Sequence, residues 1–240
     1  AMAARRYMHE YGEDRTRQAM AEIAVSTRKW ANLNPMAYFY DKPVTFEDYH
    51  NSKWVAWPFH LLDCCLVTDA GAAIVITTPE RARDAKNGSV TILGAGEGHD
   101  HSGISQMPNL TQAFGMHTGP QALEMAGIIH SDLDLAMIYD SFTYTVLVSI
   151  ENLGFCAPGE GPDLVASQRT APGGDFPLNT NGGGLSYTHP GMYGIFTIVE
   201  AVRQLRGQAG ERQLGNCDLA VAHGTGGLLS STGTVVLGVQ

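Results

Sequence analysis

The sequence predicts an α/β fold in which a sheet and helices form layers. From Val90 onward, short apolar runs typical of strands alternate with longer amphipathic runs typical of helices. Glycines close two of the predicted helices, with Gly127 after the first and Gly154 after the second. A chain of 240 residues, 44% of them apolar, is long enough to bury a sizeable core.

The first part of the chain is predicted to be helical and then irregular. Residues 14–33 favour a helix, with Asp14 or Thr16 as the capping residue at its start. Three prolines and many aromatic residues predict an irregular segment over 34–60. The apolar run 72–77 predicts a buried strand.

The remaining elements predict an alternating order. In sequence they are a short helix at 79–83, a strand at 90–93, a helix at 110–126, a strand at 133–138, a helix at 142–153, a Pro/Gly loop over 155–178, a helix over 195–205, and strands at 219–222 and 229–237. This order is that of a layered α/β protein.

Charge and composition exclude several functional classes. A net charge of −9 argues against nonspecific nucleic-acid binding, although backbone N–H groups can still hold an anionic ligand such as coenzyme A. No apolar run approaches 18 residues and no signal peptide is recognisable, so we expect no membrane span. Four cysteines without C-x-x-C spacing indicate a reducing, cytoplasmic setting. The pair His99 and His101 lacks a third ligand, so no metal site is expected.

A glycine-rich segment that ends in histidine is the first candidate site. It reads N-T-N-G-G-G-L-S-Y-T-H-P-G from Asn179 and includes Asn181, Gly183, Gly184 and His189. Glycines let the backbone approach a ligand closely, and a histidine at the start of a helix can act on what binds there. From spacing alone, a structural loop with His189 as a helix-capping residue is as well supported.

Two further segments combine polar side chains with predicted strand ends. Tyr139-Asp140-Ser141-Phe142 lies between a predicted strand and a helix, where α/β sheets place ligand-binding groups. An alternative is a strand-end tyrosine followed by an N-capping Asp140. His223-Gly224-Thr225-Gly226-Gly227 follows another predicted strand, and its alternative is a glycine turn joining two strands.

The three segments resemble the motifs of the thiolase superfamily, and along the chain, with the Tyr139 segment first and the His223 segment last, they follow the family's order. The first resembles N-x-N-G-G…G-H-P. The second resembles the family's Asn-Glu-x-Phe or His-Asp-x-Phe, with Tyr139 in the first position. The third resembles Cys-x-Gly-Gly-Gly, with His223 in place of the cysteine. The match is closest to thiolase-like lipid-transfer proteins of the sterol carrier protein x type.

The resemblance implies a thiolase-like layered fold. Residues 86–240 would be the complete C-terminal domain. Residues 1–85 would supply loop-domain helices and the last strand of an incomplete N-terminal half. Homodimers are usual in this family. Because the opening of the first half is absent from the match, apolar surface and strand edges are expected to be uncovered.

The resemblance also implies an activity, the thiolysis or condensation of 3-oxoacyl-CoA with a coenzyme A thioester as substrate and no covalently bound cofactor. His189 would activate a nucleophilic cysteine, His223 would move a proton at the α-carbon, and Tyr139 would polarise the thioester oxygen. These three rings are expected to meet around one carbonyl. The predicted substrate-binding residues are Asp140, Ser141, Asn181, Gly183, Gly184, Thr225 and Gly226. No cysteine matches the nucleophile motif, so we expect this chain to be inactive alone.

Two other functions remain open at this point. Thiolase-like aldolases that shorten steroid side chains resemble the chain at Tyr-Asp-x-Phe, which makes Tyr139 a candidate proton carrier. Those aldolases also carry a tyrosine at the place of His189, so the chain matches them at one of these two positions. Such enzymes work with a small OB-fold, zinc-containing partner protein. A noncatalytic acyl-CoA or lipid-binding protein is the third alternative, although binding alone requires neither His189 nor His223.

Overall fold

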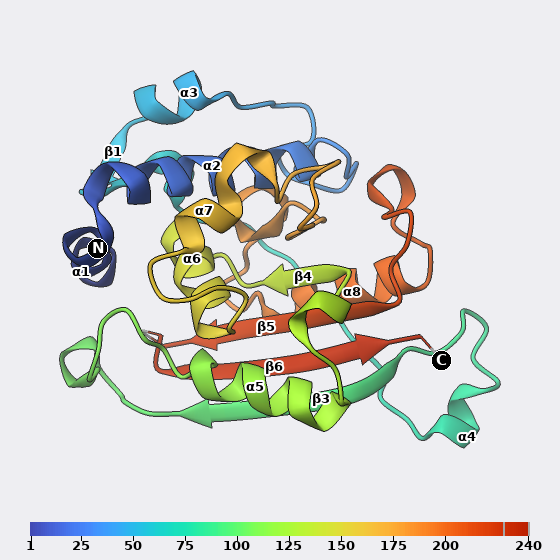
Figure 1. Ribbon diagram of the computed structural model, residues 1–240. Helices are drawn as coiled ribbons and strands as arrows, with labels where there is room; N and C mark the ends of the chain where they lie inside the picture. The colour runs from blue at the N-terminus through green and yellow to red at the C-terminus, as the bar shows by residue number, and fades with distance from the viewer. Residues whose placement is uncertain (228, 240) are drawn as a thin grey trace.

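The structure is a computed structural model that describes residues 1–227 and 229–239, and its centre is a four-stranded mixed sheet (Figure 1). The strands are β3 (Thr91–His99), β4 (Leu135–Ile138), β5 (Leu219–Gly226) and β6 (Ser231–Gly238). Their order is β3-β6-β5-β4, with β6 antiparallel to both neighbours and β4 parallel to β5.

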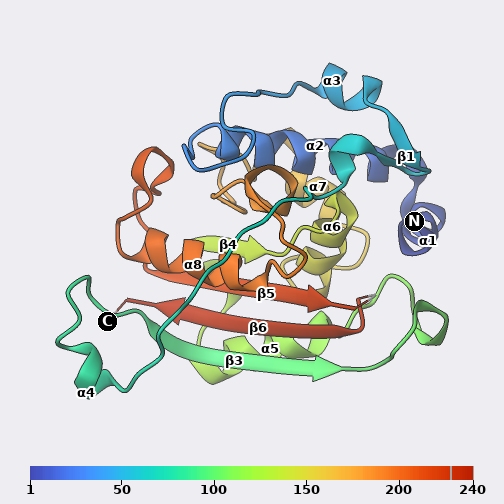
Figure 2. The same ribbon diagram turned by 180° about the vertical axis from the view of Figure 1, so that it is seen from behind.

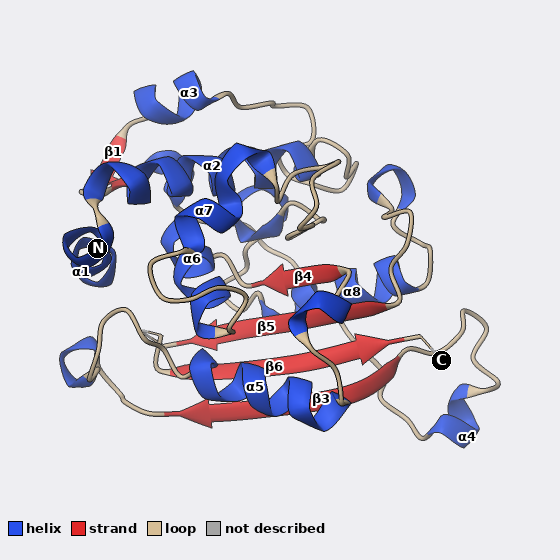
Figure 3. Cartoon of the chain, in the orientation of Figure 1, coloured by secondary structure: helices blue, strands red, loops and turns tan. Residues whose placement is uncertain are grey.

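The helices surround this sheet and cover both of its faces (Figure 3). They are α1 (Met2–Tyr11), α2 (Glu13–Ala31), α3 (Phe46–Asn51), α4 (Pro79–Ala82), α5 (Gly115–Ala126), α6 (Thr143–Asn152), α7 (Gly161–Val165) and α8 (Gly194–Leu205). A small hairpin of β1 (Trp54–Ala56) and β2 (Phe59–His60) follows α3. The prediction of an α/β class is therefore confirmed.

Alternate side chains of the buried strands face two different hydrophobic clusters. Met137 and Ala222 pack toward α8 together with Leu205. Ile138 and Val221, one position away on the same strands, pack into the larger cluster with α5 and α6. This period of two is the geometry of a sheet covered on both faces. Figure 2 shows α8 on the near face and α5 behind the sheet.

Glycines in β3 allow α5 to lie directly on the sheet. Gly94, Gly96 and Gly98 alternate along the strand and all face the helix. A Cβ atom on Gly96 would lie 2.5 Å from the carbonyl oxygen of Thr118. Any larger side chain at this position would therefore push α5 away from the strand.

The two N-terminal helices share their core with the rest of the protein. Tyr7 and Ile23 are fully buried in the same cluster as Leu147 of α6 and Val221 of β5. The Tyr7 hydroxyl donates a hydrogen bond to the buried carboxylate of Glu151. Burial of these apolar side chains is the main stabilisation of α1 and α2.

Several sequence-based boundaries need correction. Helix α2 is capped by Gly12, without the side-chain capping expected of Asp14 or Thr16. Helix α5 begins at Gly115 rather than at residue 110, because side chains of Asn109 and Asn152 accept the N–H groups of residues 111 and 113.

The strand predicted at 72–77 is wrong. A strand needs a neighbour for its N–H and C=O groups, and among the described strands none pairs with this segment. Residues 65–78 instead cross the α8 face without regular structure, and Val75 is 94% exposed (Figure 2). Among the described residues, no helix combines the length and the apolar character that crossing a membrane requires.

Candidate active site

A hydrogen bond between Tyr139 and His189 forms the centre of the candidate site. Tyr139 follows β4, and His189 lies in the turn before α8. The Tyr139 Oη atom lies 2.7 Å from His189 Nε2, and the ring centroids are 5.5 Å apart. Both side chains are half-buried, so a ligand can still reach them. The structure therefore brings together two of the three predicted catalytic rings.

The protonation of this pair follows from its surroundings. Burial lowers the pKa of His189 below its usual value, while hydrogen bonding to its own backbone and to that of Leu66 opposes the effect. Burial, followed by the nearby groups of Cys65 and Asp140, raises the pKa of Tyr139. At neutral pH the phenol is thus protonated and the imidazole neutral, and in the tautomer that carries its proton on Nδ1 the Tyr139 O–H donates to His189 Nε2.

Residues 65–68, here named the strap, connect the two segments that carry this pair. The Cys65 N–H donates to the carbonyl of Ser141, and the Leu66 N–H donates to the carbonyl of Gly184. The Thr68 Oγ1 atom accepts the N–H of His189 at 2.8 Å. The strap therefore fixes the position of the His189 backbone relative to the end of β4. No local sequence pattern indicates the strap, and the apolar run 72–77 that follows it predicted a strand.

The glycine loop closes over a buried carboxylate. Asp140 is completely buried, and its two oxygens accept the N–H groups of Gly184 at 2.6 Å and Leu185 at 3.2 Å. A Cβ atom on Gly183 would lie 1.9 Å from Asp140 Oδ2, and Gly183 has φ +60°. The loop therefore requires glycine here for both space and backbone conformation.

Asn181 and Ser141 support the same loop. Asn181 Oδ1 accepts the N–H of Gly183 at 2.8 Å and the hydroxyl of Tyr193 at 3.0 Å. The fully buried Tyr193 ring also lies beside His189 and Tyr139. The Ser141 hydroxyl lies 3.0 Å from Thr145 Oγ1. Through these contacts Asn181 and Ser141 hold the segments that carry His189 and Tyr139.

Asp140 predicts a specific pH dependence of stability. Burial raises its pKa to about 7, against 3.8 for an exposed aspartate, although the two amide donors oppose the shift. Between pH 4 and 7 the unfolded state releases this proton before the folded state does, so Asp140 lowers the stability as pH rises. We expect Asp140→Asn to reduce the fall in the free energy of unfolding between pH 4 and 7 by up to about 4 kcal/mol. Urea unfolding at pH 4, 5.5 and 7 measures the difference, and parallel curves for the two proteins would contradict it.

His223 lies away from the Tyr139–His189 pair. It follows the alternation of β5, so its ring turns to the opposite face of the sheet, toward Gly115 at the start of α5. Its Nδ1 atom lies 2.8 Å from Thr234 Oγ1, and burial lowers its pKa to about 4. The expected meeting of three rings around one carbonyl is therefore not observed, because His223 and Tyr139 project from opposite faces.

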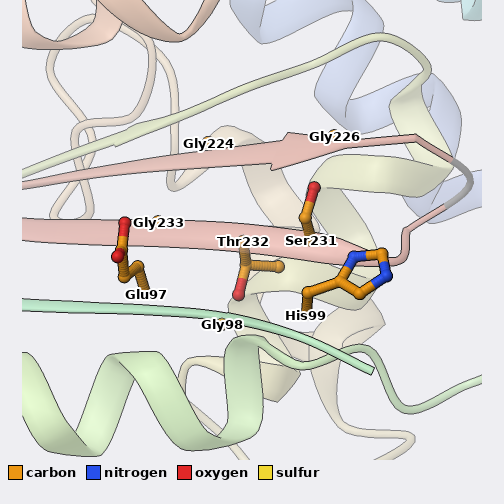
Figure 4. A pocket seen from close by; sticks show the side chains of 8 residues that line it. All are labelled: Glu97, Gly98, His99, Gly224, Gly226, Ser231, Thr232 and Gly233. Atoms are coloured by element: carbon orange, nitrogen blue, oxygen red, sulfur yellow. The ribbon is translucent and has the colours of Figure 1, made fainter. Parts of the chain in front are cut away.

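Gly224 and Gly226 after His223 extend β5, and Gly227 follows in a turn between β5 and β6. Thr225 and Gly226 pair with Thr232 and Ser231 of β6. Gly224 and Gly226 line a groove of about 480 Å³ on the α8 face of the sheet, the face that carries Tyr139 (Figure 4). Neither Tyr139 nor His189 is among the residues that line this groove.

The four cysteine thiols are unsuited to nucleophilic attack. Burial raises the pKa of Cys64 and Cys65 to about 11 and that of Cys156 and Cys217 to about 12. A catalytic thiolate requires the opposite shift. Among the described residues, no group of three His, Cys, Asp or Glu side chains is arranged to hold a metal ion.

Comparison with known proteins gives one family and several relatives. Residues 96–239 match the family described as thiolase C-terminal domain-like. The chain is 42% identical, over 94% of its length, to a steroid side-chain-cleaving aldolase of Thermomonospora curvata. It is also 42% identical, over 94%, to a 17-hydroxy-3-oxo-4-pregnene-20-carboxyl-CoA lyase of Mycobacterium tuberculosis. An acetyl-CoA acetyltransferase of Methanothermobacter thermautotrophicus is 34% identical over 95% of the chain.

A solved structure supports the same relationship. The structure titled Ltp2-ChsH2(DUF35) aldolase matches all of this chain with a TM-score of 0.91 and 38% identity. The chain covers 62% of that chain, and 58%, 59% and 59% of the three relatives in the order given above. It therefore spans about three fifths of the proteins that it resembles.

Proposed function

We propose a function from one premise, which is that this chain belongs to the thiolase C-terminal domain-like family. The proposed activity is cleavage of a carbon–carbon bond in a 3-hydroxyacyl-CoA by a retro-aldol reaction. The observation that supports this activity is the hydrogen bond of 2.7 Å between Tyr139 and a neutral His189. In this pair the imidazole can accept the phenolic proton while the Tyr139 oxygen accepts a proton from the substrate. The two relatives at 42% identity carry the names of an aldolase and a lyase, which favours this reaction over thiolysis.

The pair would move one proton in the reaction. As His189 takes the phenolic proton, the Tyr139 oxygen removes the proton of the substrate's 3-hydroxyl group. The bond between C2 and C3 then breaks, C3 becomes the carbonyl of a released ketone or aldehyde, and the electron pair passes to the thioester enolate. The enolate C2 takes a proton back, so the products are a shortened acyl-CoA and the carbonyl compound. No oxidant or second substrate is consumed.

Thiolysis is the second candidate. The 34% identity to an acetyl-CoA acetyltransferase and the Gly-rich segment with His189 favour it. It requires a thiolate, however, and burial holds all four thiols of this chain in the protonated form. For thiolysis, the nucleophile would have to come from outside this chain.

A partner protein belongs to the proposal. The structural relative's title pairs the aldolase with a DUF35 protein, which supports a partner of that type for this chain. We also propose that a small OB-fold, zinc-containing protein has this role and that the substrate is an acyl-CoA.

The need for free coenzyme A separates the two reactions. We expect the full-length protein, supplied with a DUF35-type partner, to release a ketone from a 3-hydroxyacyl-CoA at a rate independent of added coenzyme A. Thiolysis of a 3-oxoacyl-CoA consumes coenzyme A, so the rate of thiolysis rises with the concentration of coenzyme A. Carbonyl release measured by chromatography, with and without coenzyme A, decides between them. Strict dependence on coenzyme A would exclude the retro-aldol function.

A further inference from the structure

Three consecutive polar side chains, those of Asn179, Thr180 and Asn181, are buried at the start of the glycine-rich segment. The Asn179 Oδ1 atom accepts the N–H of Ile138 at 2.8 Å, one residue before Tyr139. The backbone N–H of Asn179 also donates to β4, because it bonds to the carbonyl of Ala136. The start of the glycine-rich segment is thus bound to the strand that positions Tyr139.

Asn181 connects the same three residues to the surroundings of His189. Its Oδ1 atom accepts the hydroxyl of Tyr193 at 3.0 Å. The Tyr193 ring stacks beside the His189 ring, with centroids 6.3 Å apart and an interplanar angle of 18°. A displacement of residues 179–181 would therefore change the distance between Tyr139 and His189.

Thr180, between the two asparagines, is held by α8 and by the loop that follows this helix. Its hydroxyl donates to Glu200 Oε1 at 2.9 Å and accepts Gln204 Nε2 at 3.1 Å. The two oxygens of Glu200 also accept Nε and Nη2 of Arg212, at 2.8 and 2.9 Å. None of these four side chains is more than 6% exposed. The Thr180 hydroxyl is thus bonded to a buried ion pair.

The geometry of this ion pair resists movement. Two parallel N–H···O bonds fix the guanidinium plane of Arg212 against the carboxylate of Glu200. Separating the two groups would leave buried charges unpaired, which is strongly unfavourable. Gln204 Nε2 also donates to the backbone carbonyl of Arg212 at 2.9 Å. Glu200 therefore offers Thr180 an acceptor in a fixed place.

We propose that Thr180 is a positioning residue for the Tyr139–His189 pair and that the ion pair of Glu200 and Arg212 is its anchor. Thr180 acts through the asparagines on either side of it, not on the substrate. The inference rests on the proposed function for its kinetic effect, whereas its effect on the hydrogen bond between the two rings is independent of that function. Proton transfer is sensitive to this spacing, since a misplacement of about 1 Å can lower a rate about 100-fold.

Two substitutions of Thr180 and one control separate positioning from stability. Thr180→Val removes the hydroxyl and keeps the branched shape of the side chain, whereas Thr180→Ser keeps the hydroxyl. Thr170→Val is the matched control, because Thr170 is also fully buried and its hydroxyl donates to Ser26 Oγ of α2 at 2.8 Å. Both valine variants therefore lose one buried hydrogen bond, and both should lower the melting temperature.

The first measurement is the ¹⁵N chemical shift of His189 Nε2 in the full-length protein at neutral pH. Tyr139→Phe gives the reference signal of a His189 ring without its hydrogen bond to the phenol. We expect Thr180→Val to move the His189 signal toward this reference. Thr180→Ser and Thr170→Val should leave the signal at the parental position.

The second measurement is ketone release from a 3-hydroxyacyl-CoA by the full-length protein with its partner. Thr180→Val should lower kcat about tenfold and leave KM within about threefold, because the pair is displaced while the substrate still binds. Thr180→Ser should recover at least about a third of the parental kcat. Thr170→Val should keep kcat within about twofold despite its lower melting temperature.

A double variant tests the anchor. If Arg212 acts through Thr180, then Thr180→Val combined with Arg212→Ala should be no slower than the slower single variant, within about twofold. Two losses that multiply would show that Arg212 acts by another route, which would overturn the assignment of the anchor. Arg212→Lys replaces the alanine variant, and Thr180→Ala replaces the valine variant, if either protein does not fold.

An unchanged His189 signal in the folded Thr180→Val protein would overturn the positioning role. An equal change of the signal in Thr170→Val would also overturn it, because the effect would then follow from lost stability alone. A displaced His189 signal in Thr180→Val, in a protein whose parent cleaves no 3-hydroxyacyl-CoA, would support the positioning role and remove only the retro-aldol function.

Discussion

Tyr139→Phe is expected to lower kcat for carbonyl release from a 3-hydroxyacyl-CoA by about 100- to 1000-fold, the range of a lost general acid–base group. The phenyl ring keeps the packing against His189 and Tyr193, so KM should stay within about threefold. Only the hydroxyl that shares a hydrogen bond with His189 Nε2 is removed. Steady-state kinetics of ketone release in the full-length protein with its partner measure both constants.

The control for this variant is Tyr38→Phe, which removes the hydroxyl of a tyrosine that is 61% exposed. It should retain parental kinetics. If Tyr139→Phe lowers carbonyl release and spares thiolysis, the phenol acts in the aldol reaction. A Tyr139→Phe protein that retains a third or more of the parental kcat would contradict the proposed proton relay.

Gly183→Ala is expected to destabilise the protein by at least about 3 kcal/mol, because strain and a steric clash act together. The new methyl group would lie 1.9 Å from Asp140 Oδ2, and φ of +60° is unfavourable for alanine. Neither the buried carboxylate nor the loop backbone can move without breaking the hydrogen bonds to Gly184 and Leu185. Urea unfolding measures the loss.

Gly191→Ala separates the two causes. Gly191 also has positive φ, at +87°, but a Cβ atom there meets no neighbouring atom. The cost of this variant should therefore be only about 1 kcal/mol. The double variant Gly183→Ala and Asp140→Ala should recover part of the loss, because the clashing carboxylate is gone. Equal costs for Gly183→Ala and Gly191→Ala would show that the close approach to Asp140 is wrong.

The sequence predicts where the candidate residues lie relative to strands and helices better than it predicts the face of the sheet to which their side chains point. Tyr139 and His189 stand at the end of a strand and before a helix, and such junctions at one sheet edge are expected to be close in space. The pairing of Ile138 with His223, by contrast, is set by the register of β4 against β5. Since a shift of one residue moves a side chain to the other face, the motif alone does not determine where His223 points.

The strap shows a second limit. Its residues 65–68 make their hydrogen bonds with Ser141, Gly184 and His189, at sequence separations that no local pattern reports. Apolar composition near it predicted a strand at 72–77, yet composition does not specify whether a partner strand is present. Elements with strong local signals, such as α2 and the closing Gly127 of α5, were predicted well because their signals lie within a few residues.

The exposed coil that follows the strap also bears on how this chain tolerates change over evolutionary time. Residues 69–77 donate no described backbone hydrogen bond to another element, so insertions there would lengthen a tether without altering either flank. By contrast, recombination between two related genes within this coil would combine the strap of one parent protein with the glycine loop of the other. Because the Thr68 hydroxyl must meet the His189 amide, such hybrids would survive only when both parents preserve that match.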